Sequence, residues 1–271
     1  MNTKAPVPSS AADREILPAT VCRVRRITPH LHSVTVRGPD LARFEPLGFD
    51  QALRLFLPKP GQDGLRLPVV GRDGWLAAFR AMPQDQRPRA RIYTVRAFSA
   101  AAGELEIEFV VHGEQAPASR WALRARPGDR LGLLAEGVRF RPPTYAGTHL
   151  LVGEESALPA ILGVLESAPP GWRADVLLEI PSTADIRGLP SRSGVDVRWL
   201  PRDDERRRPG DLALDALRAL PQPNPLPTYV YLVGERRLVT DGRRHVIRSW
   251  GLDPAMVEFV GYWRYGEPSA G

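Results

Sequence analysis

Residues 148–169 read THLLVGEESALPAILGVLESAP, and the pattern of the whole chain changes at this stretch. Residues 148–156 form a short apolar run that is typical of a buried strand, and residues 157–169 follow as an apolar helix. The same order recurs downstream, with strands expected at 173–182, 195–202, 228–236 and 255–263 and helices at 211–220 and 237–251. Strands that alternate with helices predict an α/β domain with a parallel sheet over residues 146–271.

The sequence before this stretch has a different periodicity. Short strands are expected at 19–28, 31–39, 52–61, 90–98, 105–113 and 128–137, separated by turns rich in Gly and Pro. Only one short helix, PASRWALRA at 117–125, interrupts them. Six strands with turn connections predict a closed antiparallel β-barrel over residues 17–145. Residues 1–16 are expected to be a disordered lead.

Composition excludes several classes of protein. The chain has 271 residues with a formal net charge of +6, but its positive charges are dispersed and no nucleic-acid-binding motif is present. No apolar run is long enough to cross a membrane, and the N-terminal residues do not resemble a secretory signal. A single cysteine, Cys22, indicates a reducing compartment, so a cytoplasmic location is expected. The mixed-charge run PRDDERRRPGD at 201–211 is interpreted as a solvated loop.

Protein-ligated metal is not expected, because one cysteine and five scattered histidines offer no ligand set. The motifs of hydrolases and of P-loop nucleotidases are also missing. Neither a hydrolase nor a P-loop nucleotidase is therefore predicted.

Several blocks of sequence, in order along both halves, carry a resemblance to a known family. They are RIYTVR at 91–96, EFVVHG at 108–113, PASRWALRARPGDRL at 117–131, LLVGEESALPAI at 150–161, VGERRLVTDGRRHVIRSWGL at 233–252 and GYWRYG at 261–266. Over about residues 17–266 the chain resembles siderophore-interacting proteins, which are flavin-dependent ferric-siderophore reductases with the ferredoxin-reductase fold. The resemblance implies an FAD-binding barrel followed by a Rossmann-like domain for NAD(P)H.

The block RIYTVR is the one that the resemblance assigns most directly to FAD. It implies that Arg91 and Arg96 supply fixed charge near the phosphates, that Tyr93 lies against the isoalloxazine, and that the Thr94 hydroxyl reaches the polar edge near N5. Strict alternation would put Tyr93 and Thr94 on opposite faces, so the strand is expected to twist or end there. The alternative is an ordinary barrel strand with an amphipathic face.

Other FAD contacts are implied along the chain. Ala118 and Ser119 lie in the first turn of the short helix, where free N–H groups can hold a pyrophosphate, although Ser119 could instead be a plain N-cap. Trp263, with Tyr262, could cover the flavin face, although strand-end aromatics are more often core residues. The remaining implied contacts are Val95, Val110, Val111, His112, Glu155, Ser156 and Ala157.

For the electron donor, NADPH is weakly favoured over NADH, and a ferredoxin is a further possibility within the family. Ser182, Thr183 and Arg187 follow the second strand of the α/β half and could hold a 2′-phosphate, whereas Glu179 could repel it.

Two departures from the family pattern stand out. Glu154 replaces the usual Asp, and Pro201 replaces a histidine, which puts any role of that histidine in doubt.

The function implied is an FAD-dependent reductase that passes electrons from NAD(P)H or a ferredoxin to Fe(III) in a siderophore and releases Fe(II) for iron assimilation. The alternatives are a general flavin or quinone reductase and a non-catalytic flavin-binding partner.

A basic cluster of Arg54, Arg139 (or Arg141) and Arg264 is expected to hold the anionic ferric siderophore, unless these are ordinary solvated arginines. The protein is expected to be a monomer.

Overall fold

The computed structural model describes residues 15–267, apart from 63, 72, 112–115, 190–192, 205 and 224–227. Most of the expected lead and His112 therefore lie outside the described residues. Ile16, which was expected to belong to the lead, begins the first strand. The described residues divide into two compact units, the first comprising 15–27 and 31–138, the second 28–30 and 139–267. Each unit is described separately.

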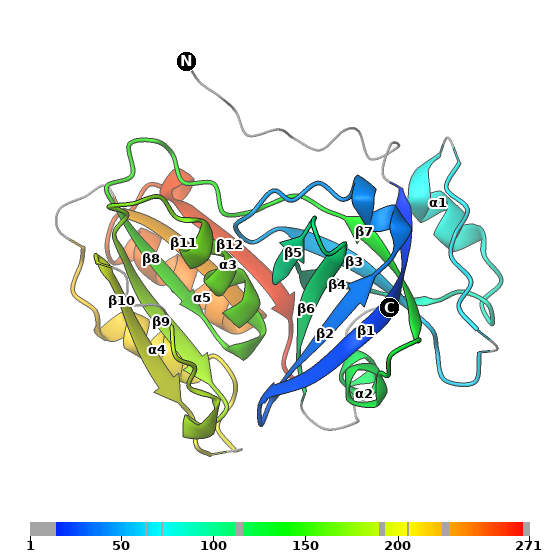
Figure 1. The fold of residues 1–271 in the computed structure, drawn as a ribbon. Coiled ribbons are helices and arrows are strands. Elements are labelled where there is room, and N and C mark those ends of the chain that lie inside the picture. The colour runs from blue at the N-terminus through cyan, green and yellow to red at the C-terminus, as the bar shows by residue number, and fades with distance from the viewer. Residues whose placement is uncertain are drawn as a thin grey trace. The chain divides into compact units, whose positions relative to one another are not determined.

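The first unit is built on one curled sheet, in which every described strand pairing is antiparallel (Figure 1). Its strands are β1 (Ile16–Thr28), β2 (Leu31–Arg37), β3 (Ala52–Leu57), β4 (Arg89–Thr94), β5 (Ala97–Ser99), β6 (Glu104–Val110) and β7 (Arg130–Ala135). They follow the order β4-β3-β7-β1-β2-β6-β5. The antiparallel architecture is confirmed, but the sheet has seven strands where six were expected.

The seventh strand arises because the predicted strand 90–98 breaks at Val95 and Arg96. Val95 donates its N–H to Gln51 O at 2.8 Å beside β3, whereas Arg96 donates to Glu106 O on β6 at 2.9 Å. These two acceptors lie at opposite ends of the strand order. The chain thus passes from one end of the sheet to the other within two residues, which closes the barrel.

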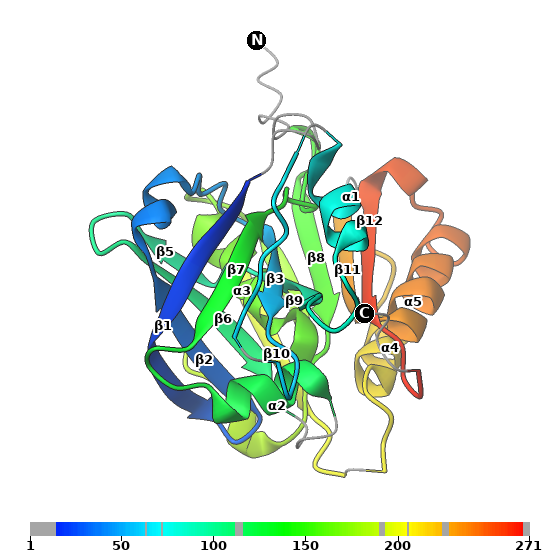
Figure 2. The same ribbon diagram turned by 90° about the vertical axis from the view of Figure 1, so that its right-hand side faces the viewer.

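Alternate strand residues fill the interior of this barrel. Leu53, Leu55, Ile107 and Phe109 are fully buried there, and burying a side chain of this size stabilises the fold by about 1.5–3 kcal/mol. The helix α2 (Pro117–Arg124) packs across one end (Figure 2) through small buried residues at helical spacing, Ala118, Ala122 and Ala125.

A second helix of the first unit, α1 (Gly74–Ala81), was not expected from the sequence. Its aromatic residues Trp75 and Phe79 pack on Phe56, with ring centroids 5.8 and 6.0 Å from that ring. Phe56 belongs to a small cluster outside the main barrel core. The apolar pattern of α1 is only two turns long, too short for periodicity to reveal it.

The second unit contains a parallel five-stranded sheet, as expected. Its strands are β8 (Thr148–Gly153), β9 (Ala174–Ile180), β10 (Val195–Pro201), β11 (Thr228–Glu235) and β12 (Val257–Trp263), in the order β10-β9-β8-β11-β12. Its helices are α3 (Leu158–Ser167), α4 (Asp211–Ala219) and α5 (Arg236–Arg248), with short 3-10 turns at Glu155–Ala157 and Thr183–Asp185. The Rossmann-like alternation of strand and helix is confirmed.

Helices cover both faces of this sheet. α4 and α5 share one apolar cluster with alternate residues of β8 and β11, including Leu150 and Val230, whereas α3 lies on the other face (Figure 1). β8 is therefore the central strand, and the residues that follow it sit in the middle of the carboxyl edge. In an open α/β sheet, ligands bind at this edge.

Within the described part of the chain, no helix has the length and apolar character that crossing a membrane requires.

Candidate functional site

In the first unit, Arg91 and Tyr93 lie on the inner face of the barrel wall. The register pairs them with Leu55 and Leu53, which belong to the barrel core. The Tyr93 ring packs on Phe109 with centroids 4.4 Å apart. Burial raises the pKa of the Tyr93 phenol, so it stays neutral at all physiological pH values. A neutral, amphipathic ring is the type of side chain expected beside a flavin.

The strand β4 ends at Thr94, close to where the sequence predicted that it would twist or end. Thr94 is buried, and the following residues leave the sheet for its opposite end. The pairing with β3 is regular up to Thr94, so Tyr93 and Thr94 still face opposite sides of β4, and their joint contact with one flavin stays a prediction. Arg96 forms an ion pair with the buried Glu108, the nitrogen and oxygen atoms being 3.4 Å apart. Val110 ends β6 and Val111 is buried beside it.

The start of α2 is packed against the same aromatic cluster. Trp121 of α2 lies 5.6 Å from Phe109, which in turn contacts Tyr93. Ala118 and Ser119 are buried in the first turn, as expected. The N-cap residue is Ala116, whose side chain cannot accept a hydrogen bond from the first N–H groups of this helix. Such a helix start attracts an anion.

The donor set of the first unit therefore fits FAD. A helix start without a side-chain cap and the half-buried guanidinium of Arg91 suit a pyrophosphate, and Tyr93 suits an aromatic ring. Burial, with the nearby Arg89 charge, lowers the pKa of Arg91, and its Nη1 donates to Ala90 O at 2.7 Å. An anion beside this guanidinium would favour its charged form. The individual roles of these residues stay predictions.

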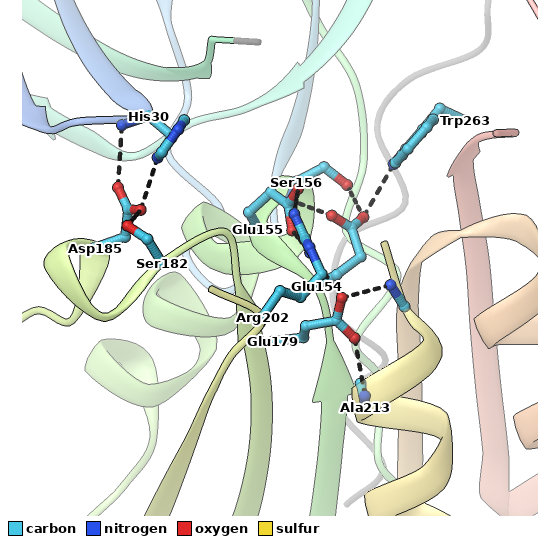
Figure 3. Close-up of polar contacts among 11 residues, drawn as sticks. His30, Glu154, Glu155, Ser156, Glu179, Ser182, Asp185, Arg202, Ala213 and Trp263 are labelled. Atoms are coloured by element: carbon cyan, nitrogen blue, oxygen red, sulfur yellow. Dashed lines mark hydrogen bonds and ion pairs between the residues drawn. The ribbon is translucent and has the colours of Figure 1, made fainter. Parts of the chain in front are cut away.

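In the second unit, Glu154 directly follows the central strand and is completely buried (Figure 3). It accepts the Ser156 N–H at 2.9 Å, a short hydrogen bond from the Ser156 hydroxyl, and the Trp263 indole N–H at 3.0 Å. Burial, reinforced by the neighbouring Glu155, outweighs these donors and raises the pKa of Glu154 to about 8. Glu154 is thus a largely protonated carboxyl near neutral pH.

Glu155 points to the other side of the same turn, where it meets Arg202. The guanidinium binds both oxygens of Glu155 at 2.7 Å, and its Nη1 also donates to Glu179 at 2.6 Å. Only 6% of the Arg202 side chain is exposed. The interpretation of 201–211 as a solvated loop is wrong at this residue. Although burial opposes it, the two carboxylates raise the pKa of Arg202, which remains charged.

Glu179 is not available to a ligand, contrary to the role considered for it. Its side chain is fully buried at the end of β9, and its oxygens accept the N–H groups of Gly210 and Ala213 at 2.8 and 2.9 Å (Figure 3). Together with Arg202, these donors use both carboxylate oxygens. Glu179 therefore fixes the start of α4 against the sheet.

The residues expected to meet a 2′-phosphate have acidic partners. Ser182 donates to Asp185 at 2.7 Å, and Thr183 donates both its N–H and its hydroxyl to Asp203, at 2.7 and 2.6 Å. Asp185 also accepts Thr28 and His30 hydrogen bonds, within the same unit (Figure 3). Burial opposes ionisation, but these bonds lower the Asp185 pKa to about 2.

Arg187 lies in the same loop as Ser182 and Thr183. The three predicted nicotinamide residues thus follow β9 in one connection of the chain. The structure gives Ser182 and Thr183 acidic partners that the sequence pattern did not reveal. Their role in holding a 2′-phosphate stays a prediction.

The three arginines of the predicted siderophore cluster differ in their surroundings. Arg54 forms an ion pair with Glu136 at 3.0 Å and stacks over Trp75 at 4.6 Å. Arg264 is exposed and pairs with Glu267, and Arg139 is exposed after the barrel. Arg54 belongs to the first unit, and the other two belong to the second. The cluster stays a prediction.

Sequence reasoning missed four residues of the carboxyl edge, namely Glu154 as the partner of Trp263, and Arg202, Arg208 and Glu235. Glu235 ends β11, accepts the N–H groups of Arg237 and Leu238, and binds Arg208 at 2.8 Å. A glutamate that ends a buried strand just before a helix was the available signal, and it occurs in VGER. No described group of three or more acidic, histidine or cysteine side chains is arranged to hold a metal ion.

Comparison with known proteins supports both halves of the chain. Residues 20–140 match the model of the siderophore-interacting FAD-binding domain, and residues 146–266 match that of the siderophore-interacting protein. The ferric vibriobactin reductase ViuB of Vibrio cholerae is 30% identical, the match covering 90% of this chain and 88% of that protein. The NADPH-dependent ferric-chelate reductase of Escherichia coli is 29% identical, over 90% of this chain and 91% of that protein.

Solved structures agree with these matches. A siderophore utilization protein from T. fusca superposes with a TM-score of 0.83 at 33% identity, covering 95% of this chain and 96% of that one. More distant reductases share the ferredoxin-reductase-like fold. Since the two models together span nearly the whole chain in the order that its two units have, the chain belongs to the siderophore-interacting protein family.

Proposed function

We propose that this chain is an FAD-dependent reductase that passes electrons from NAD(P)H to Fe(III) held by a siderophore. The observation that carries the proposal is the succession of the two matched domains along the chain, the first described as FAD-binding and both as siderophore-interacting. Two relatives that match most of the chain are named as ferric-siderophore or ferric-chelate reductases. Release of iron as Fe(II) for assimilation follows from that activity.

The first unit would hold the flavin. The start of α2 and the Arg91 guanidinium would bind phosphate oxygens, and Tyr93 would lie against the ring system as a neutral phenol. Bound FAD supplies the chemistry that joins a two-electron donor to a one-electron acceptor. The protein's part is to bind and orient the reacting groups.

The second unit would meet the electron donor at the carboxyl edge of its sheet. The turn from Glu154 to Ala157 is held rigidly on both sides, by Trp263 and by Arg202. This rigidity supports a role in positioning, because a turn fixed by buried hydrogen bonds need not be ordered when a ligand arrives. Ser182, Thr183 and Arg187 are the side chains we assign to the adenosine end.

Three finer points belong to the same proposal. A ferredoxin could replace the nicotinamide donor, the protein acts as a monomer, and it works in the cytoplasm. The single free cysteine, Cys22, supports the last point, because it is compatible with a reducing compartment.

The test begins with the visible spectrum of the purified protein and an anaerobic titration with NADPH and with NADH. We expect flavin bands that bleach with at least one donor and return when a ferric siderophore is added, while Fe(II) appears in a ferrous-specific colour assay. Bleaching without Fe(II) would indicate a general flavin or quinone reductase instead. Failure to bind added FAD would contradict the proposal entirely.

A further inference from the structure

In dinucleotide-binding α/β folds, the pyrophosphate sits where a strand turns into a helix, on the free N–H groups of the first helical turn. The second unit has three helices that follow strands, namely α3 after β8, α4 after β10 and α5 after β11. A phosphate can bind at the start of one of these helices only if the first N–H groups of that helix are not already hydrogen-bonded to another acceptor. At α4 and α5 a buried glutamate accepts such N–H groups, and at α3 a buried glutamate caps the short turn just before the helix.

At α4 the occupant is Glu179. It accepts the N–H of Gly210 at 2.8 Å and that of Ala213 at 2.9 Å, while Asp211 N donates to Arg208 O at 3.2 Å. The Glu179 side chain is completely buried. A phosphate approaching this helix would have to displace a carboxylate that is also bound to Arg202.

At α5 the occupant is Glu235, of which 1% of the side chain is exposed. Its Oε2 accepts the N–H groups of Arg237 and Leu238 at 2.6 and 3.3 Å. Its Oε1 accepts Arg208 and the N–H of Tyr265, at 2.8 and 3.1 Å. Although burial opposes it, these donors lower the pKa of Glu235, so it stays ionised and repels a phosphate.

At the turn before α3 the occupant is Glu154, which takes the Ser156 N–H. A dinucleotide fold uses glycine in this turn so that the pyrophosphate can approach the backbone. Here two acidic residues stand in the turn, and the neighbouring Gly153 serves packing instead. A Cβ at Gly153 would lie 2.6 Å from the Ala157 Cβ and 2.9 Å from Ile161 Cδ1.

The first unit shows the opposite arrangement at α2. The N-cap of α2 is Ala116, which offers no side-chain acceptor, whereas Glu154 and Glu235 cap turns of the second unit with their carboxylates. This helix start without a capping carboxylate lies in the domain that matches the FAD-binding family model. The starts that a Rossmann-type NAD(P)H site would use are closed.

From these contacts we infer that Glu154, Glu179 and Glu235 exclude the pyrophosphate of NAD(P)H from the helix starts of the second unit. The inference rests on the proposed function for the identity of the donor. Recognition of NADH then lies in the nicotinamide end, and only NADPH gains further contacts through its 2′-phosphate. An electron donor that lacks the adenosine half should consequently serve almost as well as NADH.

Binding of ADP to the FAD-loaded protein, measured by calorimetry, tests the closed helix starts directly. We expect no saturable binding to the wild type. E235A removes the carboxylate from the start of α5, so it should bind ADP at least tenfold more tightly than the wild type does. E235Q keeps an acceptor in place and should fall between the two. E179A repeats the test at α4 in case E235A does not fold.

D215A is the matched control, because it removes one exposed carboxylate of α4 away from the helix start. It should bind ADP no better than the wild type. A wild-type Kd for ADP below about 1 mM, which corresponds to 4.1 kcal/mol, would overturn the inference. So would alanine variants that bind ADP no more tightly than D215A does.

Anaerobic flavin reduction by NADH and by reduced nicotinamide mononucleotide gives a second readout. We expect second-order rate constants that agree within about thirtyfold, which is ~2 kcal/mol. A larger loss with the mononucleotide would overturn the inference. If neither donor bleaches the flavin, the proposed electron donor is wrong. The inference that the helix starts exclude a pyrophosphate would still hold if the ADP results are as expected.

Discussion

Trp263 donates its indole N–H to Glu154 Oε1 at 3.0 Å, across 109 positions of sequence. The first residue ends β12 and the second follows β8, with β11 lying between these strands. Gly234 of β11 makes room for the contact, because a Cβ there would be 2.5 Å from the same Glu154 oxygen. Its φ of +124° also requires glycine. One hydrogen bond thus depends on three strands.

The raised pKa of Glu154 makes stability depend on pH. Between its ordinary value of 4.5 and about 8, the folded protein keeps a proton that the unfolded chain has lost. The free energy of unfolding should therefore fall as pH rises through this window, by at most about 1.4 kcal/mol per unit. E154Q removes the titrating group, so its stability relative to wild type should increase with pH. Urea unfolding at pH 5.5, 6.5 and 7.5 measures this.

E267Q is the control for this experiment, because Glu267 is exposed. It should keep the wild-type dependence on pH. Parallel stability curves for E154Q and the wild type would show that Glu154 does not titrate in this window.

Among the arginines of the second unit, Arg202 should be the one whose removal lowers the free energy of unfolding most. R202M leaves Glu155 and Glu179 buried without their cation, which typically destabilises a protein by about 3–5 kcal/mol. R202K keeps the charge but cannot bind both Glu155 oxygens, so it should lose less stability than R202M does. R206M, at a side chain that is 92% exposed, should have almost no effect on urea unfolding.

The double variant E155Q/R202M separates charge from packing. If the unpaired carboxylate causes the loss, the double variant should be more stable than R202M alone. A double variant that is no more stable would assign the loss to packing.

Arg91 is expected to contribute to FAD affinity. R91A should weaken FAD binding by about tenfold to a hundredfold, because a hydrogen bond to a charged group contributes about 1.5–3 kcal/mol. Fluorescence titration of the flavin-free protein measures the affinity. R130A removes an exposed arginine at the start of β7 and should bind FAD as the wild type does. Equal affinities for R91A and R130A would remove Arg91 from the site.

The charge of Arg54 can be tested together with that of its partner. R54A should raise the half-saturating concentration of an anionic ferric chelate, and E136Q, which frees the guanidinium from its ion pair, should lower it. Both effects should weaken at high salt, because partly exposed charges are screened. Steady-state assays with one anionic and one neutral chelate measure them. Changes of equal size for both chelates would exclude a role for charge at Arg54.

Much of the fold was predictable because its elements follow simple periods. All five strands and three helices of the second unit appear in the sequence as apolar runs or as alternating and amphipathic patterns of suitable length. The break at Val95 was only partly predictable, since the pair Tyr93 and Thr94 indicated an irregularity without showing where the chain goes next. Hydrogen bonds to Gln51 and Glu106 determine that path, and they join distant segments.

The candidate site was less predictable in the second unit. Arg202 sits in a run of charges that looks solvated, and only the carboxyl ends of β8 and β9 show why it is buried. Ser182 and Thr183 had the right chemistry for a phosphate, but Asp203, twenty positions away, takes the Thr183 hydrogen bonds. Such pairings come from tertiary structure, which local patterns do not contain.

The covalent link at Val95 and Arg96 has a consequence for circular permutation of the chain. New termini placed between 94 and 97 would leave every core side chain in place, yet would free the two ends of the first sheet from each other. Freed edge strands can pair with other copies of the same chain, so this permutant should aggregate. Termini placed in the exposed turn at 100–102 would keep the link and should leave a protein that folds as a closed barrel.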